Sequence, residues 1–152
     1  MNVEQKHTSR GQVLTMIFRI AQTMRTMLDR ELEPFAVTGQ QAAMMLRCAG
    51  ASGESFESLA KSLGTDSAGI TRLADRLEEK GLMTRNPSPT DRRATLLILS
   101  SAGYDLLPIL RQAMSRWRDH VLGGVSDTEV SQLKRLLCRI LNNIEPEQDA
   151  LR

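Results

Sequence analysis

The chain has 152 residues, of which 41% are hydrophobic, so it is long enough to form one domain with a buried core. Its formal net charge of +2 and its 3% of aromatic residues argue against a uniformly basic surface and against a surface that stacks sugars or single-stranded bases. No stretch is apolar enough to cross a membrane or to serve as a signal peptide, and we therefore expect a cytoplasmic protein with no membrane partner.

A long amphipathic helix is predicted near the N-terminus. Apolar residues recur at steps of three and four from Val13 to Leu32, which is the spacing of one helical face. Thr8 or Ser9 is placed at its N-cap, because a hydroxyl oxygen can accept a hydrogen bond from a free N–H group of the first turn. Pro34 ends the helix, since the residue before a proline is pushed out of the helical region.

A capping box opens the second predicted helix. Gln41 follows Thr38 by three positions, the spacing at which the two residues cap each other's backbone N–H groups. We expect this helix over residues 39–49 and a loop over residues 50–53.

A helix-turn-helix is predicted next. Residues 56–63 have one apolar face, and Gly64 can adopt the left-handed conformation that ends a helix. Thr65 or Asp66 caps a second helix, which Gly81 ends. Two helices joined by a tight glycine turn are typical of DNA-binding proteins.

A β-hairpin, or wing, is predicted after these helices. Residues 82–85 and 94–99 are strand-like, and a turn-rich segment with an arginine tip joins them. Pro87 and Pro89 have no N–H to donate, so both are placed in the loop, outside the strand ladder.

The segment over residues 59–103 resembles the MarR family (multiple antibiotic resistance regulators). It reads LAKSLGTDSAGITRLADRLEEKGLMTRNPSPTDRRATLLILSSAG, and its most specific pattern is D-x-x-x-I-T-R-L-x-D-R-L-E-x-K-G-L followed by D-R-R. The resemblance implies a mainly α fold, with a winged helix-turn-helix and a small β-wing over residues 35–100 and dimerisation helices over residues 1–34 and 101–152. It also implies a very short strand near residues 50–53 that joins the sheet of the wing.

Two further amphipathic helices are predicted after the wing. Ser100 or Ser101 caps the first, and Pro108 inside it removes a backbone hydrogen bond and should bend it. Ser126 and Glu129 form the capping box of the second. The apolar faces of these helices and of the first helix need a partner, and a second copy of the chain in a two-fold homodimer is the simplest one. An ordinary monomeric bundle is the alternative.

The exposed face of the second helix of the motif is the predicted reading surface for double-stranded DNA. N-terminal residues of such a helix reach base edges in the major groove, and Arg72 could pair with a guanine. Asp66 is assigned to capping, because a carboxylate repels phosphate. Ala68 and Gly69 depart from the hydroxyl residues common in the family at these places. The residues assigned to DNA on this helix are Ser67, Ala68, Thr71, Arg72 and Arg76. The alternative is a solvated helix face.

The wing tip is the second predicted DNA contact. Asp91, Arg92 and Arg93 match the acidic-plus-arginine signature of the family, in which one arginine enters the minor groove and the aspartate holds an arginine. We assign Arg93 to the minor groove and Arg92 to a phosphate or to Asp91. A local ion pair is the alternative. A two-fold dimer of such readers predicts a pseudo-palindromic operator.

A ligand pocket is a further expectation from the resemblance, since small aromatic acids lodge in the family between the dimerisation helices and the winged helix. Methionine adapts to varied apolar ligands, and an arginine would pair with the carboxylate. The residues assigned to the pocket are Met16, Arg19, Met24, Met44, Met45 and Arg47. Plain core packing of the methionines is the alternative.

The two cysteines, Cys48 and Cys138, make no disulfide framework and are predicted to be buried, since both lie in apolar helical contexts. Neither lies near the N-terminus, where the peroxide-sensing branch of the family keeps its reactive cysteine. His7 and His120 are isolated, and no metal-ligand spacing, phosphate loop or catalytic motif is present. We therefore expect neither an enzyme nor a metal or cofactor.

The predicted function is a dimeric, sequence-specific DNA-binding regulator of transcription, a repressor that a small phenolic or aromatic acid releases. A redox-sensing regulator of the same family, which needs an exposed thiol of low pKa, is one alternative. A winged helix used for protein contact without DNA is another, and the arginine-tipped wing argues against it.

Overall fold

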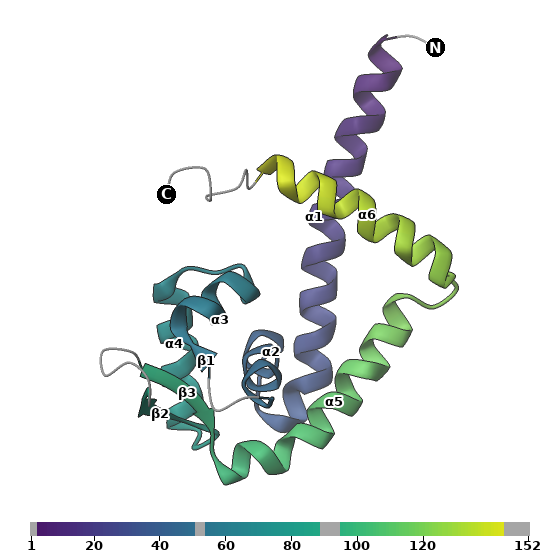
Figure 1. The fold of residues 1–152 in the computed structure, drawn as a ribbon. Coiled ribbons are helices and arrows are strands. Elements are labelled where there is room, and N and C mark those ends of the chain that lie inside the picture. Colours follow the sequence, from purple (N-terminus) through teal and green to yellow (C-terminus); the bar gives the residue numbers. More distant parts are fainter. Residues whose placement is uncertain (1–2, 51–53, 89–94, 145–152) are drawn as a thin grey trace, which may run out of the picture. The chain divides into compact units, whose positions relative to one another are not determined.

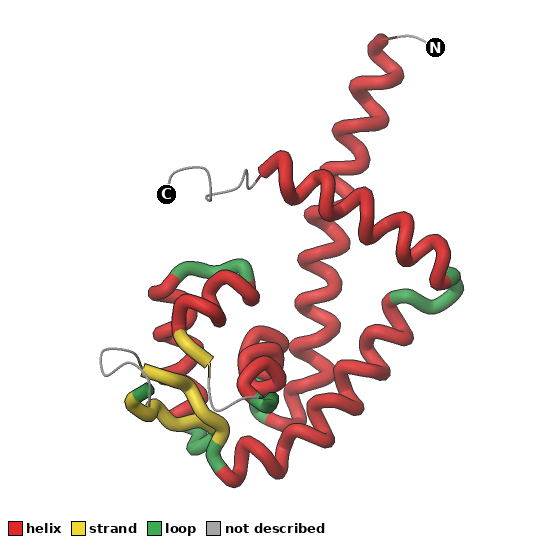
Figure 2. The backbone as a smooth tube through the Cα atoms, in the orientation of Figure 1, coloured by secondary structure: helices red, strands yellow, loops and turns green. Residues whose placement is uncertain are grey.

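The computed structural model describes residues 3–50, 54–88 and 95–144 (Figure 1). Within these ranges the chain is mainly helical, with one small sheet (Figure 2). The elements in chain order are α1 (Val3–Leu32), the 3-10 helix η1 (Glu33–Phe35), α2 (Gly39–Cys48), β1 (Glu54–Ser55), α3 (Phe56–Leu63), α4 (Ser67–Glu79), β2 (Met83–Pro87), β3 (Thr95–Leu99), α5 (Ser101–Val121) and α6 (Asp127–Ile144). The chain divides after Trp117 into two compact units.

The first helix begins earlier than predicted. Since α1 starts at Val3, Thr8 and Ser9 lie inside the helix, and their assignment as N-cap residues is wrong. The segment before them contains glutamate, glutamine and lysine, which are strong helix formers, so the chain does not need a hydroxyl cap at that point. The predicted end at Leu32 is confirmed, and Pro34 lies in η1.

Side-chain caps begin the later helices where the sequence predicts them. A capping residue can satisfy N–H groups that the first turn leaves without a partner. Gly64 also has the expected left-handed conformation at the end of α3, with φ 59°. The confirmed caps are Thr38 with Gln41 for α2, Asp66 for α4, Ser100 for α5 and Ser126 with Glu129 for α6.

The sheet has the strand order β1-β3-β2 and is antiparallel throughout. The short first strand pairs Glu54 with Leu97, which confirms the strand that the family resemblance implied. Pro87 lies opposite Thr95 at the end of β2, so its assignment to the loop is wrong. Because β2 is an edge strand, a residue without an N–H donor is tolerated there.

The helix α2 is the centre of the first unit. It contacts α1, α3, α4 and β3, and Figure 1 shows it between α1 and the winged helix. Met44 and Met45 are fully buried in its apolar face. Other fully buried residues that join the same core are Leu32, Leu59, Ile70, Leu77, Leu97 and Leu110. The core therefore fixes the two motif helices and the wing against α2.

Some long helical faces have no cover within one chain. Near the middle of α1, Phe18 is 77% exposed and Met16 is 59% exposed. The helix α6 has no buried residue, and its apolar side chains Leu136 and Ile144 are exposed. Exposed apolar surface of this extent is typical of a site for another macromolecule. No helix among the described residues has the length and apolar character needed to cross a membrane.

Among the described glycines of the first unit, the closest approach to another backbone atom lies at Gly103, in the first turn of α5. A Cβ atom on this residue would lie 2.2 Å from the carbonyl oxygen of Leu82, which is backbone and cannot rotate away. We predict that Gly103→Ala lowers the free energy of unfolding by about 1–3 kcal/mol, as in other overpacked sites.

The matched control is Gly11→Ala, another helical glycine, around which nothing lies within 4 Å. This substitution should stabilise the protein slightly, because alanine favours helix by about 1 kcal/mol over glycine. Urea unfolding of both variants measures the difference. Equal midpoints for the two variants would contradict the close approach.

Candidate nucleic-acid interface

The helix α4 presents its predicted reading face to solvent. Its buried face, with Ile70, Ala74 and Leu77, packs into the core. The opposite face carries the residues that the sequence assigned to DNA, and all of them are exposed: Ser67, Ala68, Thr71, Arg72 and Arg76. The hydroxyl of Thr71 donates a hydrogen bond to the Ser67 carbonyl at 2.9 Å, so this side chain offers DNA mainly an acceptor.

The structure gives a reason for glycine at position 69, which the sequence did not reveal. Asp66 accepts a hydrogen bond from the Gly69 N–H at 2.6 Å, and the Thr65 side chain folds over the same turn. A Cβ atom on Gly69 would lie 2.3 Å from the Thr65 hydroxyl oxygen. Glycine therefore permits the tight cap at the start of α4.

Two arginines of this face line one hollow. Arg72 and Arg76 lie one helical turn apart beside a depression of about 180 Å³, which Gln40 at the start of α2 also lines. Neither guanidinium forms an ion pair with a carboxylate in the part of the chain that the structure describes. Gln40 was not predicted, because only the fold brings it beside α4.

Arg85 on β2 is a site residue that the sequence analysis missed. Its guanidinium contacts Asp75 at 2.6 Å and Glu78 at 2.7 Å, both on α4, and lies over the Phe56 ring at 5.4 Å. The carboxylate of Asp75 is thus engaged in an ion pair within the protein. Arg85 thus holds the wing against α4 and offsets two carboxylates that would repel phosphate.

The predicted wing tip lies outside the described residues. Asp91, Arg92 and Arg93 fall between β2 and β3, so their roles remain predictions. The strands on both sides are in register up to the pair Pro87 and Thr95.

The six residues assigned to a ligand pocket do not meet at one cavity. Met44 and Met45 are core residues, Met16 and Arg19 are exposed, and Met24 is half-buried. Arg47 faces Glu54 at 3.7 Å. The structure therefore favours core packing for Met44 and Met45.

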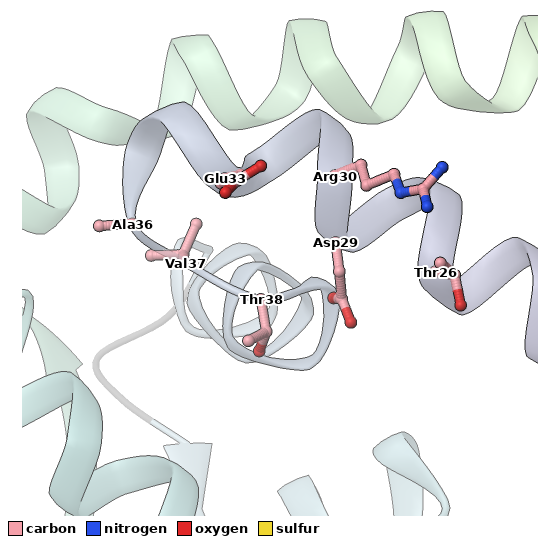
Figure 3. A pocket seen from close by; sticks show the side chains of 7 residues that line it. All are labelled: Thr26, Asp29, Arg30, Glu33, Ala36, Val37 and Thr38. Carbon is pink, nitrogen blue, oxygen red and sulfur yellow. The ribbon is translucent and has the colours of Figure 1, made fainter.

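A different concave site lies where α1 meets α2 (Figure 3). Its volume is about 480 Å³, and it is shallow and widely open to solvent. Asp29 in its wall accepts a hydrogen bond from the Gly39 N–H at 2.7 Å, a favourable place for a carboxylate because it is the N-terminus of α2. The residues lining the cavity are Thr26, Asp29, Arg30, Glu33, Ala36, Val37 and Thr38.

The two cysteines differ in environment. Cys48 is buried in α2, and burial raises the pKa of its thiol to about 12, with a further contribution from the Glu54 carboxylate that Arg47 opposes. Cys138 is exposed, so its predicted burial is wrong for the single chain. The apolar pattern of α6 suggested burial, but this helix buries no residue within one chain. Among the described residues no group of side chains could hold a metal ion.

Comparisons with known proteins agree with this geometry. The model of the MarR family matches residues 40–95. The transcriptional regulator PA3341 is 28% identical, with a TM-score of 0.76 over 88% of this chain and 98% of that one. MepR of S. aureus, solved in complex with DNA, is 23% identical, with a TM-score of 0.78 over 86% of this chain and 97% of that one. CouR of Rhodococcus jostii RHA1, solved with p-coumaroyl-CoA, is 23% identical, with a TM-score of 0.78 over 84% of this chain and 90% of that one. The predicted fold class is confirmed.

The buried thiol gives a prediction about reactivity. In the Cys138→Ser variant the only thiol is Cys48, whose pKa of about 12 leaves roughly one molecule in ten thousand as thiolate at pH 8. The folded variant should therefore not react with an aromatic disulfide reagent over an hour, and should react at once in denaturant. The matched variant Cys48→Ser reports on Cys138 alone. Rapid reaction of folded Cys138→Ser would contradict the burial.

Proposed function

We propose that this chain, whose residues 40–95 match the model of the MarR family, is a transcriptional regulator of that family. It acts as a homodimeric repressor that binds a specific DNA operator in the cytoplasm and that a small ligand releases. The observation that carries the proposal is the exposed face of α4, where two arginines lie unpaired among the described residues while Arg85 offsets the neighbouring carboxylates. This face has the chemistry to read DNA.

Each part of the site has a proposed task on DNA. Arg72 pairs with a guanine in the major groove, where Ser67 and Thr71 add hydroxyl groups near the helix N-terminus. Arg76 and Gln40 line the same hollow and contact the sugar-phosphate backbone. Arg93 enters the minor groove from the wing tip. The S. aureus relative solved with DNA supports this use of the fold.

The exposed apolar faces support the proposed homodimer. Side chains such as Phe18 on α1 and Leu136 on α6 have no cover in one chain, and burying such surface is the main driving force of association. A two-fold dimer would present two copies of α4 to successive major grooves, so the operator should be a pseudo-palindrome.

The cavity between α1 and α2 is the proposed ligand site. The sequence placed the ligand between the dimerisation helices and the winged helix, and this cavity lies at that junction. Arg30 is the one cationic residue in its lining, so it replaces Arg19 and Arg47 as the proposed partner of a ligand carboxylate. CouR, solved with an aromatic thioester, supports a small aromatic ligand.

The exposure of Cys138 keeps the redox alternative as a second candidate. In that case peroxide should release DNA from the wild-type protein and not from Cys138→Ser. If peroxide leaves both proteins bound to DNA, the ligand-responsive function remains.

The experiment that tests the function is the selection of bound fragments from genomic DNA, with and without phenolic acids. We expect enrichment of one pseudo-palindromic sequence and its loss when an effective acid is present. If no fragment is enriched, the protein-contact alternative takes the place of DNA binding.

The two arginine roles predict different mutant behaviour. Arg72→Ala should weaken operator binding by about 1–3 kcal/mol per half-site and relax the preference at one base position. Arg93→Ala should weaken binding to all core variants alike, flatten the salt dependence and reduce the preference for AT-rich flanks. Titrations against a small operator library at two salt concentrations measure both effects.

The control is Arg111→Ala, which removes an exposed arginine of α5 outside the motif and the wing. Its affinity should match that of the wild type. If Arg93→Ala changes the core base preference and Arg72→Ala does not, the two roles are reversed.

A further inference from the structure

Lys80 links the end of α4 to a distant part of the chain. It is the C-cap residue of α4, and its ammonium group donates hydrogen bonds to the Ala36 carbonyl and to Oε1 of Gln41, the latter at 2.9 Å. Both acceptors lie at the junction of η1 and α2, about forty residues earlier in the chain. We call this group of three residues the Lys80 link.

One acceptor of the Lys80 link, the Ala36 carbonyl, lies in a strained turn. Ala36 has φ 53° and is, within the described ranges, the sole residue other than glycine with a positive φ. A left-handed alanine persists only where its surroundings hold it, and such residues occur often in switching segments. Its own N–H donates to Glu33 at 2.9 Å, and its carbonyl accepts from Lys80.

Gln41 connects the same turn to the start of α2. It is buried, and its Oε1 accepts hydrogen bonds from both the Thr38 N–H, at 3.1 Å, and Lys80. The capping box of α2 and the Lys80 link therefore share one oxygen atom. A change in the cap changes an acceptor of Lys80.

The cavity between α1 and α2 contacts this turn directly. Ala36 and Thr38 belong to its lining, and Figure 3 shows both side chains on the segment that leads into α2. Asp29, also in the lining, holds the first N–H of α2. A molecule in the cavity would thus touch the residues on which the acceptors of Lys80 depend.

From these contacts we propose that Lys80 is a positioning residue, and that the Lys80 link couples the cavity to the DNA affinity of α4. The inference rests on the proposed function for its DNA-binding readout. The ammonium group does not face DNA; it holds the C-terminal end of α4 against the turn that the cavity shapes. A ligand that favours a different turn weakens operator binding by releasing this end of α4.

The first test separates positioning from a phosphate contact. Lys80→Met keeps the apolar stem and removes the donor, and it should weaken operator binding by about two- to tenfold while leaving the salt slope unchanged. Lys80→Arg, which keeps a donor, should restore most of the affinity. The control is Lys134→Met, which removes an exposed lysine of α6 outside the motif and the wing. A salt slope lower by about one in Lys80→Met means that Lys80 contacts a phosphate, and the proposal is then wrong.

The second test is a double-mutant cycle between the cavity and α4. Thr38→Ala, at the cavity wall, should weaken operator binding in the wild-type background and have no further effect in Lys80→Met. Additive effects would overturn the coupling.

Amide hydrogen exchange tests the Lys80 link in the absence of DNA. Exchange of the Thr38, Ala42 and Lys80 N–H groups should be faster in Lys80→Met, while that of α5 should be unchanged. If the wild type binds no DNA but exchange responds as expected, the proposed function fails and the link stands. If the exchange rates at all three positions are unchanged in Lys80→Met, the Lys80 link does not stabilise this turn and the proposal is wrong.

Discussion

The turn from Lys80 to Leu82, directly after α4, is the constraint on which the recognition unit depends. Lys80 donates to the η1–α2 junction, Ser100 donates to the Gly81 carbonyl at 2.6 Å, and the Ser100 N–H donates to Leu82 at 3.1 Å. Because Gly103 has no side chain, α5 can approach the Leu82 carbonyl oxygen closely. Two separate parts of the chain, the η1–α2 junction and the start of α5, thus fix the end of one helix, and the direction of α4 follows from them.

Arg85 affects the charge of the recognition surface more than the stability of the fold. Its ion pairs with Asp75 and Glu78 involve side chains that are 29–48% exposed, so each contributes about 0–1 kcal/mol. Because the chain carries a formal charge of only +2, local cancellation matters more than the total. With the two carboxylates offset, Arg72 and Arg76 are left as exposed cations on the outer face of α4.

Local rules predicted the parts of this structure that depend on neighbours in sequence. The caps Thr38, Asp66 and Ser100 act within one turn of their own helix. Spacing alone therefore identified Thr38 and placed the other two caps within one residue, at position 65 or 66 and at position 100 or 101. The roles of Arg85 and Lys80 were not predicted, because their partners come together only in the fold. Pro87 was wrongly assigned to the loop, because the position of a strand at the edge of a sheet cannot be read from its own residues.

The burial errors have a related cause, since periodicity identifies an apolar face but not what covers it. The buried Met44 and the exposed Met16 both lie on helices with apolar patterns. The same reasoning gives α1 two roles along its length. Its last residue, Leu32, is fully buried and leads into the strained turn at Ala36, whereas Phe18 is uncovered in one chain. In the proposed dimer, one continuous helix would therefore run from the partner contacts to the acceptors of Lys80. A change in how two copies pack would then reach α4 through the same turn as a ligand in the cavity.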